Sequence, residues 1–168
     1  MIVDSYKFLP RSFRPLYEGR GPFSGEEGPV WAPFDKRLAA SRICLLSSAG
    51  LYLDSSQPPF DTEREQNEPE WGDPSWRSIP STADAADIRL AHLHINDADI
   101  RSDPEIALPA RLLGEVAAER LVGSATTEHF SVMGYQDRRL DGWRQETVPA
   151  LVASLRDQQA DGLVLAPA

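Results

Sequence analysis

The chain has 168 residues, of which 26 are acidic and 17 basic, and its formal net charge is −9. This length predicts one domain with a sizeable core, and an acidic chain without a basic stripe excludes typical binders of nucleic acid or anionic membranes. Its single cysteine, Cys44, excludes an internal disulfide framework and a zinc site built from cysteines. We see no bilayer-spanning apolar stretch and no secretory signal at the start, so we expect a cytoplasmic protein.

The first 37 residues are rich in proline, glycine and scattered aromatic residues, and they lack a helical or strand-like period. This composition predicts an extended N-terminal arm over residues 1–37. Its aromatic side chains would pack either along the domain itself or against a second subunit. An α/β domain over residues 38–168 is expected to follow.

Residues 41–52 contain the first predicted core strand. The apolar run Ile43–Leu46 is followed by small residues, Ser47, Ser48, Ala49 and Gly50, as at the carboxyl end of a buried strand. Cys44 lies inside the run, where a cysteine more often fills the core than acts as a nucleophile. The serines and Gly50 could bring backbone N–H groups close to an anion, but the chain has no glycine-rich phosphate-binding motif.

A long polar loop is predicted over residues 54–82, with a short edge strand at 76–80, because Pro80 suits a strand end. The alternation over residues 88–93 predicts another strand, which runs into His92, His94 and Asn96. Polar groups at the carboxyl end of a strand, next to the start of a helix, are where open α/β sheets bind ligands. The alternative is an ordinary solvated loop.

The second half of the chain alternates between helical and strand-like patterns. We predict a helix over 110–122 that is stopped by Gly123, a strand over 128–132, a helix over 143–159 and a buried strand that begins at 163–165. The first helix would bury Leu112, Leu113, Val116, Ala117 and Leu121, and the second Val148, Leu151, Val152 and Leu155. This order predicts a three-layer Rossmann-like α/β domain with a mainly parallel sheet. Its last helix and strand units would be missing, which would leave apolar surface exposed.

Seven short segments together resemble one protein family. They are Pro29–Pro33, Ile43–Leu53, Asp73–Pro80, Ala91–His94, Leu108–Leu112, His129–Gly134 and Asp161–Leu165. No segment is specific alone, but in this order they resemble the selenoprotein B component of the glycine/sarcosine/betaine reductases and the related selenocysteine subunit of D-proline reductase. The resemblance covers residues 29–168, and the arm before it is unmatched.

The resemblance implies a redox residue directly after Ala168. In the family, the strand that matches Leu163–Leu165 leads into a selenocysteine (or cysteine) that is followed three residues later by a cysteine. Because selenocysteine is encoded by UGA, which is commonly read as a stop, we expect a selenoprotein truncated at its active-site codon and inactive alone. A shortened paralogue or an engineered fragment are the alternatives. The family also implies no cofactor in this chain, and a partner subunit whose pyruvoyl group holds an amino-acid-type substrate for reductive C–N cleavage.

The resemblance also implies which groups of this chain line the pocket. His92, His94 and His129 would act as acid or base, since histidine titrates near neutral pH. The substrate would be bound by Ser47, Ser48, Gly50, Asn96 and Arg111, of which Arg111 could hold a carboxylate in a bidentate pair. Each role has a structural alternative: the histidines could be buried and bonded to loop carbonyls, and Arg111 could pair with Asp103 or Glu105. Whether the substrate is of the glycine, sarcosine, betaine or D-proline class stays open.

Two other functions remain possible from the sequence. A non-catalytic binding or assembly subunit would pair with a partner reductase subunit, or with a copy of itself, through an exposed sheet edge and the aromatic arm. Metal-dependent hydrolysis would use His92, His94 and Asp99, but no further ligand is fixed by spacing, and no metal is expected.

Overall fold

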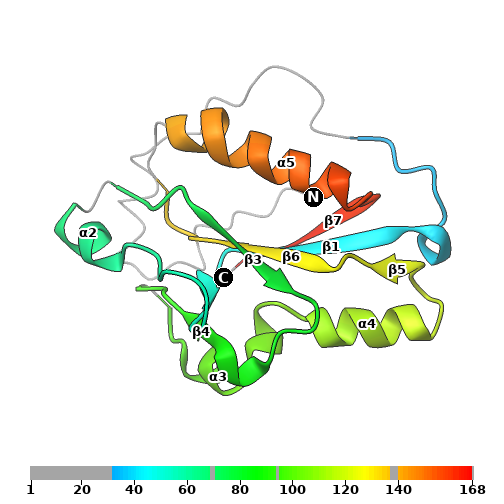
Figure 1. The fold of residues 1–168 in the computed structure, drawn as a ribbon, viewed down its shortest axis with the longest axis horizontal. Helices are drawn as coiled ribbons and strands as arrows, with labels where there is room; N and C mark the ends of the chain where they lie inside the picture. Colours follow the sequence, from blue (N-terminus) through cyan, green and yellow to red (C-terminus); the bar gives the residue numbers. More distant parts are fainter. Residues whose placement is uncertain (1–31, 69–70, 94, 137–139, 168) are drawn as a thin grey trace, which may run out of the picture. The chain divides into compact units, whose positions relative to one another are not determined.

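A computed structural model describes residues 32–68, 71–93, 95–136 and 140–167 (Figure 1). Residues Phe34–Ala168 form one compact unit. Most of the predicted N-terminal arm lies outside the described residues, so its extended conformation and its boundary at residue 37 stay predictions. None of the helices described is long and apolar enough to cross a membrane.

The main sheet is built around β1 (Arg42–Ser47). Along one edge, its first residues pair with β5 (Ser124–Ala125) and its last residues with β6 (Glu128–Val132), both in parallel. Along the other edge it pairs in parallel with β7 (Gly162–Ala166). The short edge strand predicted at 76–80 is present as β3 (Trp76–Pro80), antiparallel to β6. The fold is therefore α/β with a mainly parallel sheet, as the sequence predicts.

Helices lie on both faces of this sheet (Figure 1). On one face, α5 (Val148–Asp157) packs Leu151 against Cys44 and Phe130. On the other face lies α4 (Ala110–Ala118), near a second apolar cluster that contains Leu45 of β1. Because β1 is covered on both faces, a nearly continuous run of apolar residues is needed there rather than an alternating one.

The connections reverse direction at β1. The chain leaves β1 and returns through α4 to β6 on one side, and it then crosses through α5 to β7 on the other side. The resulting strand order β6–β1–β7, with helices on opposite faces, is a doubly wound arrangement. The point where the order reverses lies at the carboxyl ends of β1 and β7, which is the usual ligand position in such sheets.

Several short elements lie within the predicted loops. The strand predicted at 88–93 is β4 (Ile88–Leu90), which pairs with β2 (Leu51–Leu53) in a separate two-stranded antiparallel sheet. The core strand predicted within residues 41–52 is present as β1, and a turn at residues 48–50 separates it from β2, which the sequence did not show as a strand of its own. The polar segments also contain α2 (Thr62–Asn67) and α3 (Ala98–Ser102), and 3-10 turns at Leu38–Ala40, Ala85–Asp87 and Pro104–Ile106.

The predicted end of the first long helix is also wrong. Helix α4 stops at Ala118, and Arg120 rather than Gly123 takes the left-handed conformation, with φ of 61°. Gly123 instead allows two segments to approach closely, since a Cβ there would lie 2.6 Å from the carbonyl carbon of Ala40. The predicted burial fails at Leu112 and Leu121, which are 51% and 59% exposed.

The last two elements differ from prediction in their exposure. A π-helical turn (Trp143–Thr147) precedes α5, in which Leu151 is buried but Val148 and Val152 are exposed. Strand β7 was expected to be buried, yet Leu163–Leu165 are between 38% and 64% exposed. The reason is that β7 pairs only with β1 among the described strands, and α5 lies over Cys44 of β1 and Phe130 of β6. Apolar surface is therefore exposed along β7.

Candidate functional site

Small residues gather where β1, β6 and β7 end. Ser47, the last residue of β1, lies opposite Ser131 of β6 on one side and Ala166 of β7 on the other. Both serines are fully buried. Ser48 follows at the start of the turn, where its N–H donates to the carbonyl of Ala166 at 3.2 Å. The predicted pair Ser47 and Ser48 thus lies at the reversal point of the sheet.

The backbone N–H groups of this turn are all occupied. Beyond the Ser48 bond to β7, Ala49 donates to the Ser47 hydroxyl at 3.2 Å and Gly50 to the Val132 carbonyl at 2.9 Å. Leu51 donates to the Ser131 hydroxyl at 2.7 Å. An anion would therefore have to displace an existing hydrogen bond, and the suggested role of these N–H groups in holding one is not supported.

The backbone conformation of this turn requires a glycine at position 50. Its φ is +68°, and a Cβ would lie 2.6 Å from Sδ of Met133 and 3.3 Å from the Ala91 carbonyl oxygen. The Gly50 carbonyl accepts a hydrogen bond from Ala91 N–H at 3.0 Å. This contact brings the end of β4, and with it His92, to the same edge of the fold as Ser47.

His92 and Asn96 lie on the segment that leaves β4. His92 is half-buried, and its charge contributes to lowering the pKa of Asp97, after the larger effect of the Arg101 hydrogen bond. Asn96 is exposed, and its Oδ1 lies 3.5 Å from the N–H of Ala98. His94 lies outside the described residues, so the structure does not test its predicted role.

His129 is placed apart from this edge, inside the sheet. It is fully buried as the second residue of β6, and its Nδ1 accepts a hydrogen bond from Leu45 N–H at 3.3 Å. Burial lowers its pKa to about 4, although the charge of Glu105 acts in the opposite direction. The imidazole is therefore neutral at physiological pH, and its role as an acid or base stays a prediction.

Arg111 is occupied in a surface ion pair. Its guanidinium donates to Glu115 at 2.5 Å, one turn further along α4, and its side chain is 67% exposed. Its backbone N–H, rather than its side chain, bonds to Glu105 at 2.9 Å. The structure therefore shows neither of the two side-chain pairings considered from the sequence.

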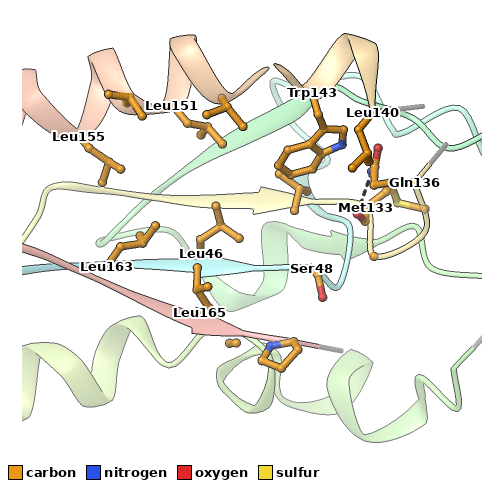
Figure 2. Close-up of a pocket in the computed structure, with 16 residues that line it drawn as sticks. Leu46, Ser48, Met133, Gln136, Leu140, Trp143, Leu151, Leu155, Leu163 and Leu165 are labelled. Carbon is orange, nitrogen blue, oxygen red and sulfur yellow. Dashed lines mark hydrogen bonds between the residues drawn. The ribbon is translucent and has the colours of Figure 1, made fainter. Parts of the chain in front are cut away.

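A large apolar cavity, open to solvent along β7, lies between α5 and the main sheet (Figure 2). Its volume is about 620 Å³. Leu46 and Leu163 lie along its floor, Trp143 and Leu155 line it from the helical side, and Ser48 marks one end. Sequence reasoning missed it because the helical stripe and the last strand were both expected to be buried.

The hypothesis of a metal centre gains no support from the described residues. In that part of the chain, no three histidine, cysteine, aspartate or glutamate side chains are placed to hold a metal ion. His94, one of the proposed ligands, is not among the residues searched.

Comparison with known proteins gives one informative match. No protein-family model and no solved structure matches the chain. It is 23% identical over 137 residues to D-proline reductase subunit gamma of Acetoanaerobium sticklandii, a match that covers 82% of this chain and 52% of the relative. The chain thus spans about half the length of the curated relative that it matches. The D-proline reductase part of the resemblance predicted from the seven segments is thus confirmed at the level of sequence similarity: the chain is distantly similar to D-proline reductase subunit gamma.

Proposed function

We propose that this chain is a subunit of a selenol- or thiol-dependent reductase complex that cleaves C–N bonds of amino-acid-type substrates. The observation that carries the proposal is the match to D-proline reductase subunit gamma over 82% of the chain. Since the chain spans about half of that relative, the activity, the substrate and the pyruvoyl-bearing partner all belong to the proposal.

The topology supports a redox residue at the reversal point of the sheet. The Ala166 carbonyl is bonded to Ser48 N–H, so polypeptide that continues from β7 emerges beside the turn that follows β1. A selenol or thiol placed there would lie at the carboxyl edge, where doubly wound sheets hold their ligands. A selenol ionises well below the thiol value of about 8.5, so it would be a nucleophile at neutral pH.

The proposed reaction needs two protein groups, a selenol and a thiol, and its atoms and electrons balance with these two alone. The selenolate attacks the substrate carbon, a Se–C bond forms, the C–N bond breaks, and the amine leaves with a proton. The thiolate of the following cysteine then attacks selenium, and the carbon is released with a proton as C–H. Selenol and thiol are thereby oxidised to a selenenyl sulfide while the substrate is reduced by two electrons.

His92 is the best placed of the described histidines to supply the first proton. It follows Ala91, which is bonded to Gly50 at the carboxyl edge, whereas His129 is buried with a pKa of about 4. Ser47, Ser48 and Gly50 would shape the pocket beside it. The contributions of His94, Asn96 and Arg111 are carried over from the resemblance alone.

The first test is the nucleotide sequence after the Ala168 codon, combined with the intact mass and selenium content of the native product. We expect UGA, an open frame with a cysteine three codons later, and a longer product that contains selenium. A UAA or UAG codon with a native mass that matches 168 residues would contradict the reductase proposal.

The second test is turnover by the full product with its pyruvoyl partner and a dithiol. His92→Gln should lower kcat by about a hundredfold, which is typical for loss of a general acid. Asp157→Asn, at the exposed last residue of α5, is the matched control and should leave kcat unchanged. Equal effects of the two variants would remove His92 from the mechanism.

A non-catalytic assembly subunit is the second candidate function. It is favoured by β7, whose uncharged residues Leu163–Leu165 are exposed along an edge that could accept another strand. A native product of 168 residues that forms a stoichiometric complex with the purified partner subunit would support it. Failure of Leu165→Lys to weaken that complex would argue against β7 as the contact.

A further inference from the structure

The apolar cavity beneath α5 is open along β7 and so forms a groove (Figure 2). Leu163 and Leu165 of β7 line this groove, together with Leu46 of β1 and Val152 of α5. In the parallel register of the two strands, Leu163 lies beside Cys44 and Leu165 beside Leu46. Because paired residues of neighbouring strands point to the same face of a sheet, both leucines belong to the face on which α5 packs. The groove is thus the part of that face that α5 leaves uncovered.

The spacing of helices and strands indicates what would cover the groove. Helix α5 lies over β1 and β6, since Leu151 packs against Cys44 of the first strand and Phe130 of the second. Strands in a sheet are about 4.8 Å apart and packed helices about 8–10 Å apart, so each helix covers about two strands. A helix beside α5 would therefore lie over β7 and over one further strand. The edge of β7 can accept that strand, because β7 pairs only with β1 among the described strands.

The handedness of the connections fixes the face on which such a helix would lie. The chain crosses from β6 past β1 to β7 through α5. Connections between parallel strands are right-handed in nearly all proteins, so a further step in the same direction places its helix on the same face as α5. A parallel strand beyond β7 also needs a crossover of a dozen or more residues. The next helix of this fold would therefore lie in the groove.

A second copy of the chain would not close the groove. Two copies joined edge to edge through β7 would place their α5 helices about 19 Å apart, which is four strand spacings and about twice the usual distance between packed helices. A channel one helix wide would remain above the two joined strands. The occupant that fits is therefore a helix and not another sheet edge.

We propose that the polypeptide that follows β7 forms a crossover helix in the groove between α5 and β7, and a parallel strand along the free edge of β7. This inference rests on the proposed function, in which the chain continues beyond Ala168. The length of the matched relative supports it, since the match covers only 52% of that protein. The helix should carry an apolar stripe with a spacing of three and four residues, which packs on the leucines of β7.

Cysteine labelling tests whether a helix lies in the groove. Leu163→Cys and Val152→Cys replace residues that line it from β7 and α5, whereas Val164→Cys and Ala153→Cys replace neighbours that do not. All four positions are exposed, so a chain that ends at Ala168 should react with iodoacetamide at similar rates at each. In the full native product, Leu163→Cys and Val152→Cys should react at least tenfold more slowly than their neighbours. Peptide mass spectrometry assigns each label to its site.

Equal rates at the four positions of the full product would overturn the inference. Slow labelling of Leu163→Cys and Val152→Cys already in the 168-residue chain would also overturn it, because residues before β7 would then cover the groove. Protection that appears only at high protein concentration, or only with the partner subunit, would identify an interface between chains instead.

The labelling result is independent of the tests of the proposed function. A selenium-containing product that turns over substrate but labels equally at the four positions would retain the reductase function and exclude the helix. A product with the expected protection but without selenium or turnover would retain the helix and exclude the reductase function.

Discussion

At the scale of single residues, the environment of His129 shows how burial can keep a histidine from acting as an acid near neutral pH. A histidine in a predicted strand is a reasonable candidate acid, but here Leu45 N–H donates to Nδ1, so Nδ1 carries no proton. Nε2 must then carry the proton of the neutral ring, and it has no hydrogen-bond partner among the described residues. A second proton would place a charge in the core, which explains a pKa of about 4.

The depressed pKa of His129 predicts an acid-dependent loss of stability. Between the ordinary value of 6.5 and the folded value of about 4, the unfolded state binds more protons than the folded state. The contribution of His129 to the free energy of unfolding should therefore be constant above about pH 6.5 and fall as the pH drops toward 4, by at most about 3 kcal/mol. Urea unfolding at pH 7, 5.5 and 4.5 measures this.

A matched pair of variants shows whether His129 causes that pH dependence. His129→Gln removes the titrating group while its amide oxygen can still accept from Leu45 N–H, so the decline below pH 6.5 should become shallower. His92→Gln removes a half-buried histidine at the carboxyl edge and should leave the decline in place. If both variants follow the wild-type curve, the decline comes from carboxylates instead.

At the scale of elements, the start of α4 depends on a side chain that precedes it in sequence. The Glu105 carboxylate accepts hydrogen bonds from the N–H groups of Arg111 and Leu112, at 2.9 and 3.1 Å. It satisfies two donors that a helix leaves unpaired and places a negative charge at the positive end of the helix dipole. Pro109, the residue at the cap position, provides no such side chain.

Glu105→Ala should therefore destabilise the protein by about 1 kcal/mol, as for loss of a helix cap. Glu115→Ala on the same helix is the control, because its ion pair with Arg111 is exposed and contributes less than about 0.5 kcal/mol. Urea unfolding at pH 7 compares the two. An effect of Glu115→Ala equal to that of Glu105→Ala would show that the helix responds to net charge and not to capping.

The elements that could be predicted from sequence are those with strong local signals. Apolar runs located β1 and β7, the β-like pattern of residues 128–132 located β6, and a terminal proline located β3. Helix ends were missed because the stop of α4 depends on a left-handed Arg120, which no residue preference indicates, while Gly123 is needed for a distant backbone contact. The short elements β2, α2 and α3 have too few residues to show a period.

The candidate site was predicted only in part, for a related reason. Ser47, Ser48 and Gly50 are adjacent in sequence, so their meeting at one edge follows from the end of β1. The approach of His92 depends on the pairing of β4 with β2, a contact between segments that no local pattern shows. Exposed apolar surface was expected from the missing last units, but its position between α5 and β7 could not be predicted, because hydrophobic periodicity does not show which apolar side chains stay uncovered.

At the scale of the whole molecule, β1 is the strand on which the fold depends. It pairs with three other strands and contributes to the apolar clusters on both faces. Cys44, at its centre, is fully inaccessible, and burial raises the pKa of its thiol. Since it is the single cysteine of the chain, its reactivity reports on the opening of this strand alone.

Thiol labelling of Cys44 should therefore follow global unfolding. If opening is fast and reversible, the labelling rate equals the rate of a free thiol multiplied by the unfolding equilibrium constant. Its logarithm should then rise linearly with urea, with the slope measured by circular dichroism. Ser102→Cys, at an exposed position of α3, should label at the free-thiol rate at every urea concentration. Labelling of Cys44 that does not depend on urea would mean that β1 is reached by a local opening, and that the sheet does not unfold as one cooperative unit around it.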